Sequence, residues 1–140
     1  MALKASALKV GDTYSERVVE NLSRTQIVQY AGASGDYNPL HTDEVYTTQV
    51  AGYPSVFAHG MLTMGLTGKM LTNYVGDGTL TKFGVRFTNQ VWPGDTLDST
   101  AIVAAIWGEG EQLYVDLTLS TVNQDGKEVV AGWATARIKP

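Results

Sequence analysis

The sequence contains no cysteine and only two histidines among its 140 residues. The absence of cysteine excludes disulfide bonds, a thiol nucleophile and a thiolate metal site. Acidic residues outnumber basic residues by 14 to 10, which gives a formal net charge of −4. A protein that binds nucleic acid or an anionic membrane surface by general attraction needs a basic face. We therefore expect neither as a partner.

Long apolar runs are also missing. No stretch approaches the roughly 18 uninterrupted apolar residues of a membrane span, and residues 1–5 begin no run of signal-peptide length. We therefore expect no membrane insertion and a cytoplasmic protein. A chain that is 44% hydrophobic and 17% charged has a globular composition. Its length suits a single domain over residues 1–140.

Several common catalytic motifs are absent. Residues 32–35 read Gly-Ala-Ser-Gly, one residue short of the nucleophile elbow of serine hydrolases. Neither histidine belongs to the H-E-x-x-H spacing of zinc enzymes, and no glycine-rich phosphate-binding motif occurs. We expect no metal and no cofactor. Trp92, Trp107 and Trp133 are interpreted as packing residues, because base stacking would need a basic surround.

The first half of the chain carries short helical signals after one predicted strand near residues 14–19. Ser23 is a favourable helix N-cap, and apolar residues at helical spacing follow until a glycine, at 32 or 35, ends the helix. Residues 36–41 are not expected to form regular helix. Pro39 lacks an amide hydrogen and pushes the preceding residue toward extended geometry.

Two further helices are predicted before residue 76. The first is expected to begin after Thr42, a favourable N-cap that is followed by acidic residues in the first turn, and to run to about Val50. The longest helix is predicted over 60–75, where apolar residues occupy most of the circumference, so it should be buried. Gly65 and Gly68 each cost about 1 kcal/mol relative to alanine in a helix. We expect the close approach of another backbone to compensate.

The second half alternates between apolar and polar residues as strands do. Strands are predicted over 83–87, 97–107, 113–120 and 129–138, and a Pro-Gly-Asp turn at 93–95 leads from the first of these into the second. With the N-terminal strand they make an antiparallel sheet that must bury one face. Helix 60–75 is its natural partner. The expected fold is α+β, a curved antiparallel sheet wrapped around one central helix.

Asp36 and His41 lie five residues apart in an irregular turn that contains proline. A carboxylate and an imidazole at this spacing can approach within one water of each other and activate that water between them. Asn38 offers donor and acceptor groups that would fix the geometry. Asp36 and Asn38 are equally explained as turn residues whose side chains bond their own backbone. The two interpretations remain open at this point.

His59 and Gly60 begin the long predicted helix. The first amide groups of a helix lack internal partners and carry the positive end of its dipole, and glycine lets a ligand oxygen approach closely. Such a site would stabilise an enolate oxygen at a thioester carbonyl. The alternative is that His59 caps the helix and Gly60 makes a convenient turn. For His59 itself we favour a structural or supporting role.

The residues from Tyr30 to His41 resemble the R-specific hydratase motif of the MaoC-like dehydratases. The passage Ala-His-Gly-Met-Leu at 58–62 is similar to the start of that family's central helix, and residues 85–87, followed by 91–97, resemble its strand-turn-strand passage. The likeness extends from Val10 to the C-terminus. The first motif is quite specific, whereas the Pro-Gly-Asp turn alone would be weak.

The resemblance implies a hot-dog fold and a lyase that hydrates enoyl thioesters or dehydrates 3R-hydroxyacyl thioesters. Asp36 and His41 would be the catalytic pair, Asn38 would orient or neighbour them, and the Gly60 amide, beside His59, would contact the thioester carbonyl. Coenzyme A or acyl carrier protein would enter as part of the substrate. A homodimer is implied, or a heterodimer with a related hot-dog subunit. Candidates for binding the carrier phosphate are the cations Arg86, Lys69 and Lys82.

Two other functions compete with hydration. A hot-dog thioesterase also uses an acidic residue and a helix N-terminus, but the grouping of Asp36, Asn38 and His41 is not expected of it. A non-catalytic acyl-binding subunit of a heterodimer would have no need of Asp36 and His41, and both are present. Hydratase activity is therefore the favoured prediction.

Overall fold

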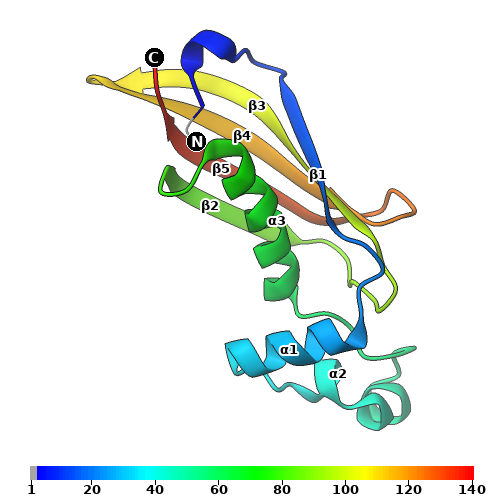
Figure 1. Ribbon diagram of the computed structural model, residues 1–140. Coiled ribbons are helices and arrows are strands. Elements are labelled where there is room, and N and C mark those ends of the chain that lie inside the picture. The colour runs from blue at the N-terminus through cyan, green and yellow to red at the C-terminus, as the bar shows by residue number, and fades with distance from the viewer. Residues whose placement is uncertain (1–2) are drawn as a thin grey trace.

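The computed structural model describes residues 3–140. Residues 1 and 2, which belong to the N-terminal segment in which no signal peptide is expected, lie outside this range. Five strands within this range form one antiparallel sheet in the order β1-β3-β4-β5-β2. The sheet curves around α3, and α1 and α2 lie beyond the N-terminal end of that helix (Figure 1). The elements are η1 (Ala5–Ala7), β1 (Thr13–Val19), α1 (Arg24–Ser34), α2 (Pro39–Thr42), η2 (Tyr46–Val50), α3 (Gly60–Val75), β2 (Leu80–Phe87), β3 (Leu97–Glu109), β4 (Gln112–Val122) and β5 (Glu128–Ile138). The predicted α+β layering is confirmed.

The sheet forms where apolar and polar residues alternate. On β4, Leu113, Val115, Leu117 and Leu119 all point to the helix side and belong to or pack against the core. Strand β2 was predicted from the sequence, but without any order of strands in the sheet. This strand pairs with β5 at the far edge of the sheet and not with β3, which follows it in the chain. Residues 88–96 therefore connect the edge strand β2 to β3 on the other side of the sheet. Strand order could not be predicted, because strand neighbours depend on long-range packing that the local sequence does not encode.

Helix α3 begins and ends at the predicted residues. Gly60 follows the N-cap His59, and Gly76 is the C-cap. Its side chains join two apolar clusters. Met70, Leu71 and Val75 pack on the concave face of the sheet, and Leu62 packs among residues of α1 and the strand ends.

The expectation of a helix buried nearly all round is wrong on one side. Met61, Gly65, Lys69 and Asn73 recur every four residues and form an exposed stripe along α3. No atom of residues 3–140 lies within 4 Å of a Cβ built on Gly65, apart from the helix backbone itself, so no second backbone approaches there. A Cβ built on Gly68 would lie 3.1 Å from the ring of Phe83. The close neighbour there is therefore a side chain and not the predicted backbone.

Of the helical segments before α3, α1 has the predicted caps, and the two segments after it depart from the prediction. Helix α1 begins after Ser23, whose side chain accepts a hydrogen bond from the Gln26 amide, and it ends at Gly35 with φ of 76°. The turn that begins at Pro39 is helical, contrary to expectation. Proline is tolerated at the first position of a helix because the amide hydrogen that it lacks would have no partner there. The next helical segment is capped by Asp43, which accepts from the Tyr46 amide, and not by Thr42.

Two of the three tryptophans lie on the outer face of the sheet and not in the core. Trp107 is 39% exposed and stacks on Tyr114 with ring centroids 4.4 Å apart. Trp133 is 50% exposed, and its ring covers Gly84, where an added Cβ would lie 2.4 Å from it. Trp92 packs against Phe57. All three tryptophans thus pack on other residues as expected, although two of them do so on the outer face. Within residues 3–140, no helix is both long and apolar enough to cross a membrane.

Replacing Gly65 with alanine should raise the free energy of unfolding by about 0.5–1 kcal/mol, because the helix gains propensity and the new methyl group meets no neighbour. Urea unfolding at a fixed protein concentration measures this change. Gly132→Ala is the matched control. Its Cβ would lie 2.7 Å from the Gly84 carbonyl oxygen, so that variant should lose stability. A loss of stability in Gly65→Ala would show that another surface covers the exposed stripe.

Candidate active site

The candidate site forms where two chain segments meet at the N-terminal end of α3. The first segment leaves α1 through Gly35, whose left-handed backbone turns the chain, and continues through Asp36 into α2. The second segment runs through Phe57 to His59, the N-cap of α3. The amide of Phe57 donates to the Leu40 carbonyl, 3.2 Å away, and so ties the two segments together.

Asp36 and Asn38 both act as turn residues, as one of the two interpretations proposed. The Asp36 carboxylate accepts from the Asn38 amide at 3.2 Å, and the Asn38 side chain accepts from the Leu40 amide at 2.9 Å. These bonds fix the direction in which the Asp36 side chain leaves the turn. The turn interpretation and the functional one are therefore compatible, because the same bonds that shape the loop hold the carboxylate in place.

His41 is oriented by a hydrogen bond to the main chain. Its Nδ1 donates to the Phe57 carbonyl oxygen at 2.6 Å. Because a carbonyl oxygen only accepts, the hydrogen of the neutral ring lies on Nδ1, and Nε2 has a free lone pair. The ring is half-buried and packs edge-on against Phe57, with centroids 5.2 Å apart. An imidazole held in this tautomer is suited to accept a proton.

His59 lies behind His41 and is only 1% exposed. Its Nε2 donates to the Asp36 carbonyl oxygen at 3.0 Å, and its ring stacks on the His41 ring with centroids 4.0 Å apart. Burial lowers the pKa of His59, and the nearby His41 lowers it further, although the Asp36 carbonyl and carboxylate act in the opposite direction. A lowered pKa favours the neutral ring at pH 7, and a neutral ring that donates through Nε2 carries its hydrogen there.

The three side chains form one cluster. One potential ligand atom from each of Asp36, His41 and His59 lies within 4.8 Å of the others. Polar atoms at this separation can share a bridging water, and a carboxylate beside an imidazole lone pair can activate it. Two histidines and a carboxylate are also residue types that bind metal ions. The prediction of a metal-free site stays a prediction.

Gly60 opens α3 beside this cluster. The Leu62 and Thr63 amides both donate to the His59 carbonyl, at 3.1 and 3.3 Å, which leaves the Gly60 amide at the positive end of the helix. The ring of Phe87 lies over Gly60, and an added Cβ would come within 3.1 Å of it. A larger residue at this position would therefore have to displace the Phe87 ring by a few tenths of an ångström.

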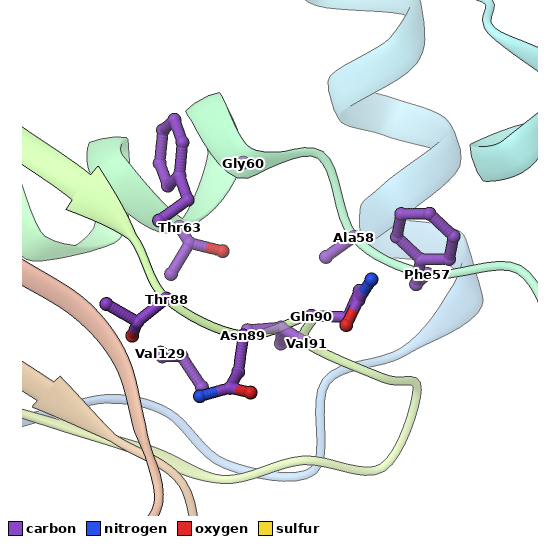
Figure 2. Close-up of a pocket in the computed structure, with 10 residues that line it drawn as sticks. Phe57, Ala58, Gly60, Thr63, Thr88, Asn89, Gln90, Val91 and Val129 are labelled. Atoms are coloured by element: carbon purple, nitrogen blue, oxygen red, sulfur yellow. The ribbon is translucent and has the colours of Figure 1, made fainter.

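A pocket of about 260 Å³ adjoins the same turn. Phe57, Ala58 and Gly60 border it, and Thr88, Asn89 and Gln90 close it from the connection after β2 (Figure 2). Asp36 and His41 do not line this pocket, but His41 bonds the carbonyl of Phe57, which does. The catalytic candidates and the pocket therefore share one short segment, 57–60.

The three candidate cations lie away from the pocket. Lys82 borders a shallow depression on the outer face of the sheet, together with Trp107 and Trp133. Arg86 lies on the same face of β2, four residues further on, and Lys69 is exposed on α3. Within residues 3–140 the structure thus brings together Asp36, Asn38, His41, His59 and Gly60, but not these cations.

Several residues of the site were not identified from the sequence. The Phe57 carbonyl, which orients His41, carries no side-chain signal at all. Phe87 was singled out only as part of a strand and of the family-like passage, not as a site residue, and Asn89 and Gln90 follow that strand without any recognisable motif. Polar residues directly after a strand are a weak indication of a site. Only the fold shows that this loop reaches α3.

The fold and sequence were compared with known proteins. Residues 5–124 match the MaoC-like domain. The solved R-hydratase PhaJ1 from Pseudomonas aeruginosa superposes with a TM-score of 0.85 at 26% identity, over 99% of this chain and 86% of that one. This likeness confirms the predicted hot-dog fold.

Two curated relatives illustrate the sequence similarity. The (R)-specific enoyl-CoA hydratase of Rhodospirillum rubrum is 30% identical over 126 residues, 89% of this chain and 85% of that protein. The peroxisomal enoyl-CoA hydratase 2 of Arabidopsis thaliana is 36% identical over 107 residues, 74% of this chain. This chain spans only 32% of the Arabidopsis protein's length, and still less of several other relatives. From the domain match and the full-length similarity to the Rhodospirillum protein, we conclude that the chain belongs to the MaoC-like dehydratase family.

Proposed function

We propose that the protein is a hydro-lyase that adds water reversibly to trans-2-enoyl thioesters and yields 3R-hydroxyacyl thioesters. The observation that carries the proposal is the tautomer of His41. Its Nδ1 is engaged by the Phe57 carbonyl, so the Nε2 lone pair is free, and a ring nitrogen of His41 lies within 4.8 Å of an Asp36 carboxylate oxygen. The names of the relatives, enoyl-CoA hydratases and an R-hydratase, support the same chemistry.

In the proposed reaction, a water lies between His41 and Asp36. His41 Nε2 takes a proton from this water while the Asp36 carboxylate orients it, and the oxygen forms a bond to C3 of the substrate. The electron pair of the double bond moves to C2 and the thioester oxygen, where the Gly60 amide and the dipole of α3 stabilise the enolate. The protonated pair then delivers its proton to C2. One water is added in total, and dehydration is the reverse.

The substrate class is an acyl thioester carried by coenzyme A or by acyl carrier protein. The pocket beside Gly60 suits the thioester and the first part of the acyl chain, since apolar side chains and a few amides and hydroxyls line it. Arg86, Lys69 and Lys82 remain candidates for the carrier phosphate. Because none of the three lines this pocket, they would bind the phosphate of a carrier that extends across the protein surface, or contribute to a site on a second subunit.

We also propose that the protein dimerises through β2. This strand is an edge of the sheet as far as residues 3–140 show, and an open edge invites another strand. Its last residue, Phe87, is 51% exposed and its ring contacts Gly60, and the residue after Gly60, Met61, is 56% exposed. A second copy, or a related hot-dog subunit, would cover them and border the pocket at Gly60.

Ultraviolet absorbance tests the proposed function directly. Purified protein mixed with short and long trans-2-enoyl-CoA substrates should remove the conjugated-enoyl band and give a 3R-hydroxyacyl product by chiral analysis. Release of free thiol without hydration would instead identify a thioesterase. If neither change occurred with coenzyme A or acyl carrier protein substrates, the active-enzyme proposal would be wrong and a binding subunit would remain.

Replacing Asp36 with asparagine or His41 with alanine should lower kcat by about 10²–10⁴-fold, the range that general acid–base groups contribute. The fold should survive, because Asp36 is exposed and His41 is half-buried. Steady-state hydration with circular dichroism on the same samples measures both effects. Asp125→Asn, at an exposed carboxylate on the β4–β5 turn, is the matched control and should keep full activity. Near-wild-type turnover in either site variant would falsify the assignment.

Removal of metal ions should leave the activity unchanged, because the proposed pair activates water through a lone pair and a carboxylate alone. Protein dialysed against EDTA, with its metal content checked by elemental analysis, should hydrate crotonyl-CoA at the untreated rate. A loss of activity that added zinc or iron restores would show that Asp36, His41 and His59 bind a metal instead.

A further inference from the structure

His59 makes two separate contacts to the proposed catalytic pair, one to each member. Through Nε2 it donates to the carbonyl oxygen of Asp36, at 3.0 Å. Through its ring face it stacks on His41, with centroids 4.0 Å apart and a tilt of 26°. A single buried side chain therefore contacts both the loop that presents the carboxylate and the ring that presents the lone pair.

We infer that His59 is a positioning residue of the proposed hydration, which fixes the Asp36 loop by its Nε2 hydrogen and the His41 ring by stacking. The inference rests on the proposed function. It assigns His59 no contact with the substrate and no proton transfer. Its role is to keep the carboxylate and the His41 Nε2 at the separation that a shared water requires.

The other ring nitrogen of His59 argues against a mere packing role. Among residues 3–140, Nδ1 is buried and has no hydrogen-bond partner. A buried polar atom without a partner is unfavourable, and a phenylalanine ring would fill the same space without that penalty. His59 is the N-cap of α3, yet its side chain makes no cap hydrogen bond, so helix capping does not explain the imidazole. The bond from Nε2 to Asp36 is the contact that an apolar ring would lose.

The surroundings of His59 favour the tautomer that this role needs. The titratable groups that face it are Asp36 on the preceding loop, His41 on α2 and Tyr30 on α1, whose ring centroid lies 4.8 Å away. Burial keeps the pKa of His59 below its usual value. A neutral ring with its hydrogen on Nε2 is the state that donates to a carbonyl and places no second positive charge against His41 while His41 holds a proton.

Two substitutions separate the two contacts. His59→Phe keeps a stacking ring and removes the donor, and His59→Gln keeps an amide donor near the position of Nε2 and removes the ring. If positioning is the role, His59→Phe should lower kcat by about 10²-fold with little change in KM, the size of effect expected from small misplacement of reacting groups. His59→Gln should recover part of this loss. Ile27→Val, which trims a fully buried residue of α1, controls for general loss of stability and should keep the wild-type kcat.

Nitrogen-15 spectra of the histidine rings test the same inference without any substrate. The wild type should show the hydrogen of His59 on Nε2 and that of His41 on Nδ1 at pH 7. In His59→Phe the His41 Nδ1 hydrogen should exchange faster with water, because its ring is held less firmly. A His59 that is charged at pH 7 or carries its hydrogen on Nδ1, or a His59→Phe variant with wild-type kcat, would overturn the inference. If the wild type hydrated no thioester, the proposed function would fail, and the spectra alone would then decide the positioning.

Discussion

The hydrogen bond from His41 to the carbonyl of Phe57 is the interaction on which the rest of the site depends. It fixes the ring direction and, because the acceptor is a carbonyl, it also fixes which nitrogen carries the hydrogen. The Phe57 carbonyl is held in turn by the short segment that enters α3, where the Ala58 amide donates to the Val91 carbonyl at 2.8 Å. A shift of this segment would move the acceptor, the lone pair and the start of the helix together.

The hot-dog architecture explains why so short a segment can be held firmly. Helix α3 is packed into the concave face of the sheet, and buried hydroxyl groups add polar contacts between them. Thr67 on the helix bonds Thr121 on β4 at 2.7 Å, and Thr121 bonds Ser99 on β3 at 2.6 Å. These bonds fix the position of the helix along the sheet, which apolar packing alone would leave less well defined. The N-terminal end of α3 is therefore a fixed point against which the loop from α1 to α2 is placed.

The loop itself contributes the other half of the site through bonds that are mostly local. Asp36, Asn38 and Pro39 form consecutive turns, and the side chains of Asp36 and Asn38 accept from backbone amides that a loop would otherwise leave unpaired. His59 then joins the loop to the helix by a bond to the Asp36 carbonyl. The geometry of the pair thus combines local turn chemistry with one long-range contact from a buried imidazole.

Those two sources explain what the sequence predicted well and what it did not. Strand β4 and the limits of α3 were predicted because alternation and flanking glycines are local signals. The place of β2 beside β5 was not predicted because strand order is set by packing across the whole sheet.

Local rules also failed where two of them competed. Pro39 was judged to exclude helix, yet at the first position of a helical turn its missing amide costs nothing. Gly65 was assumed to need a close neighbour because the helix was expected to be buried on every side, and it lies instead on the exposed stripe. Asp36, Asn38, His41, His59 and Gly60 could be singled out from motifs. Their partners could not, since the carbonyls of Phe57 and Asp36 have no side-chain identity that a sequence records.

The central claim is that one water is activated between His41 and Asp36 and added across a double bond. Hydration of a trans-2-enoyl-CoA in deuterium oxide, followed by proton and deuterium NMR of the product, tests it most directly. The account predicts a 3R-hydroxyacyl-CoA with one deuterium at C2 in a single configuration, because the oxygen and the proton arrive from the same side of the bound substrate. Deuterium distributed over both C2 positions, or free coenzyme A with the double bond intact, would contradict it.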